Sequence, residues 1–197
     1  MKRILHLSAA SVLKPGEAPD VSFVPPLVRR RLSPLQKMYF ALANAVEKSP
    51  AGCSVFASGD GEDSLTRRIV ADFNADGSVS PHRFSSSVYN AAPGLWSVHT
   101  GNRAPYTAVA SKESSIEAGI LECLGGTLPA LFVYAEETGG GYGAAVFFTE
   151  DGDRIVEVTE GDPSLPPISF ADYAAFISGE VEAVSGRWVS LRNGRSE

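Results

Sequence analysis

A group of reactive side-chain types follows a stretch of small residues in the middle of the chain. The segment 104–119, APYTAVASKESSIEAG, reads as a short strand that runs directly into a helix. Between the two elements stand Ser111, Lys112 and Glu113. Many α/β enzymes display a nucleophile at such a turn from strand to helix. The first question is whether this turn, which we call the elbow (residues 110–115), carries a group that can react.

The elbow serines lack the surroundings of an activated nucleophile. Such a serine needs a base within hydrogen-bonding reach, usually a histidine that a third group holds in place. No G-x-S-x-G sequence surrounds Ser111, Ser114 or Ser115, and His99 is the nearest histidine along the chain. Capping of the helix N-terminus explains Ser114 and Ser115 at least as well. A serine hydrolase is therefore disfavoured.

Glu113 leaves two interpretations open. The helix macrodipole favours a carboxylate in the first turn, so a purely structural role is sufficient. The alternative is an enzyme of unknown type that uses Glu113 with Ser111 or Lys112. A carboxylate that acts as acid or base needs a second titratable partner, and none is evident in the neighbouring sequence.

The composition is that of a soluble globular chain. Its 197 residues can form one good core or at most two small ones, and 44% of them are hydrophobic against 20% charged. A formal net charge of −6 argues against a nucleic-acid partner, because phosphate binding needs a cationic face. No apolar run approaches the ~20 residues of a membrane-spanning helix. Segment 1–13 fits an edge strand better than a signal peptide, because His6 and Ser8 interrupt its apolar part.

The cysteines and histidines do not predict a metal site. Cys53 and Cys123 lie far apart in apolar surroundings, which is typical of buried free thiols in a reducing cytoplasm. There is no CxxC pair, and His6, His82 and His99 lack metal-ligand spacing. We therefore expect a cytoplasmic protein that holds no metal and no cofactor.

Strand-like and helical segments alternate along the chain. One helix begins after Ser33, a favourable N-cap, with Pro34 at its first position. Pro93 is expected to kink or break a helix within 80–101. Alternation of this kind predicts an α/β structure with a mainly parallel sheet. The expected strands are 2–13, 53–59, 106–111, 128–137, 142–151 (a hairpin with the one before) and 186–194, and the expected helices are 33–49, 64–73, 114–124 and 170–179.

Several of these segments together resemble a known family. The run SSSVYNAAPGLWSVHTGNRAP (85–105), the strand TAVAS after it and the helix that begins at Glu113 resemble the N-terminal half of β-ketoacyl synthases of the thiolase fold. VPPLVRRRLSPLQKMYFALANAV (24–46) and VFASGDGE (55–62) fit the second helix and strand of that fold. The chain looks most like the shortened ketosynthase-like proteins that act as chain-length factors in aryl-polyene biosynthesis clusters.

The resemblance covers roughly residues 1–150, and its most specific part is 85–122. It implies an α/β fold that is half of a thiolase-like fold, with a mixed, mainly parallel sheet flanked by helices. We expect one domain over 1–197, in which 152–197 form a C-terminal extension of unclear role. A cap over the sheet face that the second half of a ketosynthase would cover is one interpretation of this extension.

Departures from the family pattern imply that the chain is not catalytic. Counted from Pro105, the position of the ketosynthase cysteine falls on Glu113. A carboxylate cannot form the acyl thioester that condensation needs. Two histidines normally come from the second half of such enzymes, which this chain lacks, and its own three histidines match neither.

The resemblance also implies a partner. Ketosynthases dimerise through the strand before the elbow, which pairs antiparallel with its counterpart across a two-fold axis, and an unpaired edge strand is a liability for a monomer. A full-length β-ketoacyl synthase is the expected partner, acyl carrier protein is reached through the complex, and a homodimer is an open alternative for the isolated chain. The residues expected to pair are Thr107, Ala108, Val109, Ala110 and Ser111.

Three aromatic residues are candidates for the far wall of an acyl tunnel. In chain-length factors such bulk limits chain growth by steric exclusion, and here the candidates are Tyr89, Trp96 and Tyr106. The alternative for each is a plain core aromatic. The expected function is a chain-length factor in polyene or fatty-acyl biosynthesis, and the alternative is a stand-alone acyl-binding or scaffold module.

Overall fold

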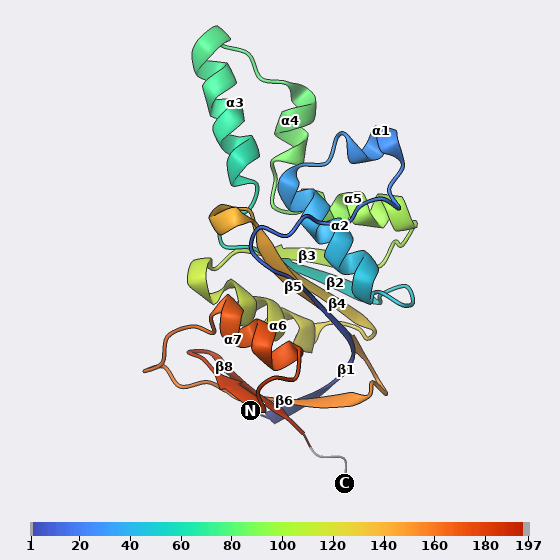
Figure 1. Cartoon of the computed structure of the whole chain (residues 1–197), viewed down its shortest axis with the longest axis vertical. Helices are drawn as coiled ribbons and strands as arrows, with labels where there is room; N and C mark the ends of the chain where they lie inside the picture. The colour runs from blue at the N-terminus through green and yellow to red at the C-terminus, as the bar shows by residue number, and fades with distance from the viewer. Residues whose placement is uncertain (1, 195–197) are drawn as a thin grey trace.

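One sheet of eight strands runs through the molecule in the order β3-β2-β4-β5-β1-β6-β8-β7 (Figure 1). The structure is a computed structural model that describes residues 2–194. The strands are β1 (Lys2–Leu13), β2 (Cys53–Ala57), β3 (Tyr106–Val109), β4 (Ala130–Glu136), β5 (Tyr142–Thr149), β6 (Arg154–Glu160), β7 (Ala183–Ser185) and β8 (Val189–Asn193). The helices are α1 (Pro26–Arg29), α2 (Pro34–Val46), α3 (Asp63–Asp76), α4 (Pro81–Ser86), α5 (Ala91–Thr100), α6 (Ser115–Gly125) and α7 (Phe170–Ile177), with short 3-10 turns η1 (Lys112–Ser114) and η2 (Thr138–Gly140).

The α/β fold with a mixed sheet is confirmed, but the sheet is mostly antiparallel. Among the described residues, β2 pairs in parallel with β3 and β4, and the other five pairings are antiparallel. The expectation of a mainly parallel sheet was wrong because β1 does not join β2. It lies between β5 and β6, antiparallel to both, so the prediction that it is an edge strand is also wrong.

Helices cover both faces of the sheet. Helices α2 and α5 pack on one face, and α6 and α7 pack on the other (Figure 1). The buried strand β4 supplies side chains to both layers, since Leu131 and Val133 face the α2 side while Phe132 faces the α6 side. This two-sided burial explains why β4 reads as a continuous apolar run, as the predicted 128–137 strand did.

A capping residue and a proline explain where α2 and α5 begin. The Ser33 hydroxyl accepts a hydrogen bond from the Gln36 amide, and the Gln36 side chain accepts one from the Ser33 amide, both at 3.0 Å. This capping box confirms the predicted start of the helix. Pro93 does not break α5, because the helix starts at Ala91 and Pro93 falls in its first turn, where no backbone donor is needed.

The segment after 152 completes the face covered by α6. It contributes β6, α7, β7 and β8, and the ring of Tyr173 on α7 lies 6.1 Å from that of Phe132. The fully buried Glu117 on α6 accepts hydrogen bonds from the amides of Trp188 (2.8 Å) and Val189 (3.3 Å). The helix 170–179 and strand 186–194 are confirmed, whereas β6 and β7 were not predicted.

Helices α3 and α4 project from the body as a hairpin (Figure 1, top). Neither helix contains a buried residue. Their large apolar side chains therefore stay in contact with solvent, Phe73 at 56% and Phe84 at 62% exposure. Within the described residues, no helix has the length and apolar character needed to cross a membrane.

Candidate functional site

The elbow is held in shape by a serine and by an unusual backbone conformation. After β3 the chain makes the turn η1 and enters α6. The Ser115 hydroxyl accepts a hydrogen bond from the Ser111 amide (3.0 Å) and donates one to the Lys112 carbonyl (2.7 Å). Lys112 has a φ of 49°, the one left-handed non-glycine backbone among the described residues. Ser114 sits at the N-cap of α6 without a capping side-chain bond, so Ser115 does the local bonding.

Glu113 lies at the rim of a small cavity beside the elbow. The cavity has a volume of about 180 Å³. The Glu113 side chain is exposed at the start of the helix that follows β3, as predicted. The neighbouring Lys112 reaches across to Asp60, with 3.2 Å between the ammonium and the carboxylate. The lining residues are Gly59, Asp60, Lys112, Glu113, Tyr134, Glu136, Thr138 and Tyr142.

The floor of this cavity is a buried carboxylate with a structural role. Glu136 is 3% exposed and accepts hydrogen bonds from the Ser58 hydroxyl (2.9 Å), the Asp60 amide (3.3 Å) and the Gly59 amide. It thereby fixes the turn that follows β2. Burial, helped by the adjacent Glu136 carboxylate, raises the pKa of Tyr134 far above its ordinary value, so the phenol stays protonated.

The described lining of the elbow cavity lacks the serine–histidine or cysteine–histidine pair of an activated nucleophile. Among its described lining residues there is no histidine, serine or cysteine. The Lys112 ammonium has a raised pKa, caused first by its hydrogen bond to Asp60, so it remains a cation. Within the described residues, the exposed Glu113 carboxylate forms no hydrogen bond or ion pair, although other titratable side chains line the same cavity.

The three aromatic candidates lie in different surroundings. Tyr89 lies at the elbow side, where its hydroxyl donates to the Gly59 carbonyl (3.1 Å) and its ring covers Gly61. Tyr106 is 41% exposed at the start of β3. Trp96 is buried against α2, where its indole donates to Glu47 (2.6 Å). The structure therefore gives Trp96 the contacts of a core aromatic and leaves Tyr89 and Tyr106 half accessible.

Strand β3 is an edge of the sheet, as expected for the strand before the elbow. It pairs with β2 alone. The Ser54 amide donates a hydrogen bond to the Pro105 carbonyl, and the Ser58 amide donates one to the Val109 carbonyl. The odd-numbered residues of this segment therefore direct their backbone polar groups toward β2. The polar backbone groups of Tyr106 and Ala108 therefore point away from the sheet. Of the five residues predicted to pair, Thr107, Ala108 and Val109 lie within β3, and Ala110 and Ser111 follow it.

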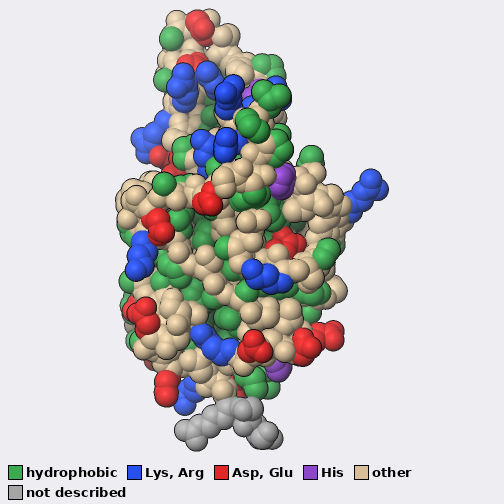
Figure 2. Space-filling view, turned by 45° about the vertical axis from the view of Figure 1, so that its right-hand side comes forward, with side chains coloured by type: hydrophobic (Ala, Val, Ile, Leu, Met, Phe, Trp, Pro, Cys, Tyr) green, Lys and Arg blue, Asp and Glu red, His purple; other side chains and the backbone are tan. Residues whose placement is uncertain are grey.

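Sequence reasoning missed an apolar surface that lies above β3. We call it the upper apolar surface, and Figure 2 shows apolar side chains at the surface of this projecting part of the molecule. The available signal was the helical spacing of apolar residues in α3 and in α5, for which the sequence offers no covering element. The exposed members are Val70, Phe73, Phe84, Val88, Leu95 and Val98.

The thiols are both buried and free, as predicted. Desolvation raises the pKa of the Cys53 thiol, and it raises that of the Cys123 thiol further. Both side chains are therefore neutral and unreactive near neutral pH. Within the described residues, no cluster of three or more metal-ligating side chains exists.

Comparison with known proteins identifies the family. A family model described as β-ketoacyl synthase, N-terminal domain, matches residues 7–138. A chain in the solved structure of a ketosynthase (ApeO) in complex with its chain length factor (ApeC) from Xenorhabdus doucetiae superimposes with a TM-score of 0.75 at 17% identity, over 98% of this chain and 100% of that one. No curated protein sequence matches the chain. Since the family model covers most of the chain, the protein belongs to the β-ketoacyl synthase N-terminal domain family.

Proposed function

We propose that the protein is a non-catalytic ketosynthase-like subunit, a chain-length factor, that pairs with a full-length β-ketoacyl synthase in the cytoplasm. The observation that carries the proposal is the open edge of β3 directly before an elbow that presents Glu113. The products would be polyene or fatty-acyl chains made in the manner of type II polyketides. Acyl carrier protein would reach this subunit through the complex.

The open edge supports a strand-pairing partner. β3 presents unpaired backbone donors and acceptors, and an edge of small residues such as Ala108 is free to add a strand. Helix α5, which carries Leu95 and Val98 of the upper apolar surface, contacts β3, and these exposed side chains would extend the area that a partner covers. A ketosynthase is a suitable partner because ketosynthases dimerise through the corresponding strand before their own elbow.

The elbow supports a non-catalytic role. Condensation needs a thiolate that carries the acyl group as a thioester, and the count from Pro105 would put Glu113 at the position of that cysteine. The cysteines of this chain are buried with raised pKa values, so neither replaces it. The chain would thus contribute walls to the site of its partner.

The half-accessible tyrosines support a part in limiting chain length. Tyr89 and Tyr106 lie toward the β3 edge and the elbow, where a partner's acyl tunnel would end. An acyl chain that grows into such a wall meets overpacking, which costs ~1–3 kcal/mol for each misfit. Trp96 packs against Phe40 within the core, so this role falls to the two tyrosines.

Co-purification with a full-length ketosynthase tests the proposal. The expected result is a stable 1:1 complex by size-exclusion chromatography. Ala108→Pro removes an outward-facing amide of β3 while it spares the bonds to β2, so this variant should fold and lose the complex. Glu180→Gln, an exposed residue just past the C-terminal end of α7, serves as the control and should keep it.

Two results would overturn the proposal. One is a monomer indifferent to the ketosynthase, which would favour the alternative of a stand-alone acyl-binding or scaffold module. The other is condensation of malonyl and acyl units by the purified chain alone. If that turnover vanished in Glu113→Gln, the third interpretation, an enzyme that uses Glu113, would replace ours.

A further inference from the structure

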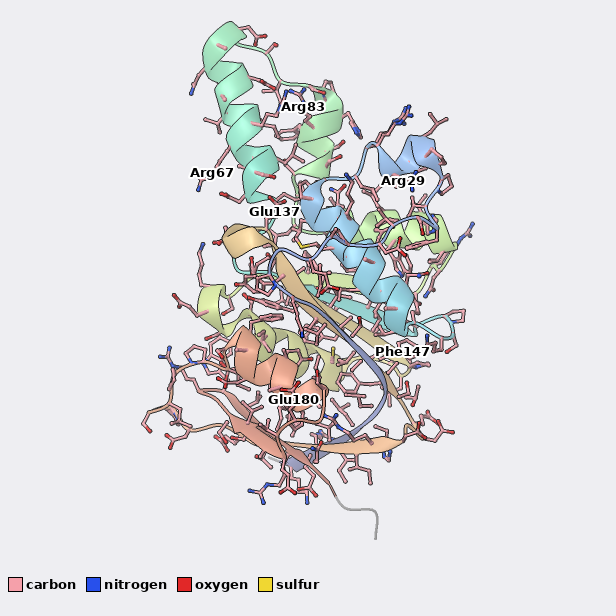
Figure 3. All side chains as sticks on the ribbon, in the orientation of Figure 1. Arg29, Arg67, Arg83, Glu137, Phe147 and Glu180 are labelled. Carbon is pink, nitrogen blue, oxygen red and sulfur yellow. The ribbon has the colours of Figure 1, made fainter. Side chains whose placement is uncertain are left out.

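Two glutamates meet at the base of the projecting hairpin. Glu62 directly precedes α3, and Glu137 directly follows β4. Figure 3 labels Glu137 where the base of α3 meets the body. The two carboxyl groups lie within hydrogen-bonding reach of one another, although 75 positions separate them along the chain. The hairpin is therefore attached to the sheet at a point where two like groups face.

Each carboxyl group uses one oxygen and leaves the other buried without a partner. The first oxygen of Glu62 accepts hydrogen bonds from the Ser33 hydroxyl (3.0 Å) and the Gln36 amide group (2.8 Å). The second oxygen of Glu137 accepts one from the Ser64 amide (3.1 Å), in the first turn of α3. The remaining oxygen of each, Oε2 of Glu62 and Oε1 of Glu137, is buried and unbonded, and Glu62 as a whole is 4% exposed.

We propose that Glu62 and Glu137 share one proton between their unbonded oxygens, and that this proton holds the base of the α3–α4 hairpin to the body. A single O–H donor satisfies both oxygens at once, whereas two ionised carboxylates there would be buried like charges. The pair therefore forms a proton-dependent clamp between α2, α3 and the end of β4. The proposal depends on these contacts alone and requires no partner protein.

The surroundings of the pair support protonation. The groups that face Glu62 from α2 and its N-cap, Gln36 and Ser33, are neutral, and the one ionisable group that faces it from β4 is Glu137. Desolvation, opposed by the two neutral donors and aided by the Glu137 charge, raises the pKa of Glu62 to about 7. Among the described residues, no cation forms an ion pair with either carboxyl group.

The sign of the effect follows from the raised pKa. The folded pKa of about 7 exceeds the ordinary 4.5, so the clamp is complete below 4.5 and is lost as pH rises through 7. Across that window, the equilibrium constant for opening the base of α3 should rise by up to about tenfold per pH unit and then level off. Loss of the clamp frees the hairpin, not the whole fold, because α3 and α4 bury no residue.

Hydrogen exchange of the isolated chain from pH 5 to 8 tests the clamp. Exchange is corrected for the intrinsic rate, and ¹³C-carboxyl NMR is used to find the glutamate that titrates near 7. We expect the α3 amides to show the rising opening constant and Glu62→Gln to abolish both signals. Glu180→Gln, just past the C-terminal end of α7 and away from the hairpin (Figure 3), should keep both.

Glu137→Gln keeps the proposal testable if Glu62→Gln does not fold. It removes the facing charge and offers an amide donor to the open oxygen of Glu62, so the titration should move to lower pH. Opening constants that do not change with pH, or a carboxyl titration near 7 that survives both substitutions, would overturn the proposal.

Discussion

The centre of the sheet is covered on both faces, whereas the β3 edge is open to solvent. All residues of β4, and all of β5 except the half-buried Tyr142 and Thr149 at its ends, are buried, and aromatic rings of both layers meet at packing distance. At the edge, β3 is open along one side, and the upper apolar surface above it is exposed. The chain thus forms its buried core without burying this edge. The exposed apolar groups need an explanation other than the core, and the partner subunit that we propose would supply one.

Removing a buried ring from the centre of the sheet should have the largest effect on the free energy of unfolding. Phe132 is fully buried on β4, and its ring lies so close to Gly119 on α6 that the helix can approach only because that residue has no side chain. Phe132→Ala should lower the free energy of unfolding by about 3–5 kcal/mol, because the two packed layers cannot collapse into the space. Denaturant unfolding followed by circular dichroism measures it. A loss below about 1 kcal/mol would mean that this centre is loosely packed.

A carboxylate between α6 and the C-terminal strands gives the next effect. Glu117→Ala leaves the buried amide of Val189 and the part-buried amide of Trp188 without their acceptor, which should cost about 1–3 kcal/mol. The matched control is Glu122→Ala on the same helix, which is exposed and should stay within about 0.5 kcal/mol of the parent. Equal losses of unfolding free energy in the two variants would show that Glu117 does not attach the C-terminal segment after 152 to the centre of the sheet.

The comparison also separates what the sequence could predict from what it could not. The start of α2 was predictable because Ser33 and Pro34 act within one turn, and the β4–β5 hairpin because its glycines join two apolar runs. The elbow position of Glu113 followed from the short strand of small residues that runs into a helix. The place of β1 was not predictable, since its partners β5 and β6 begin more than 125 residues later in the chain. The Glu62–Glu137 pair escaped notice for the same reason, because only the fold brings these residues together.

The smallest effect on stability is expected in the upper apolar surface, where the same residue type as in the first prediction can be changed. Phe73 on α3 is 56% exposed, so Phe73→Ala should change the free energy of unfolding by no more than about 0.5 kcal/mol. Its effect should appear in the complex with a ketosynthase, as faster dissociation measured by surface plasmon resonance, because exposed aromatic residues often anchor interfaces. Phe132 and Phe73 therefore form a matched pair, one for folding and one for assembly. A Phe73→Ala chain that unfolds early, or that holds its partner unchanged, would remove the distinction between the buried centre and the upper apolar surface left for a second subunit.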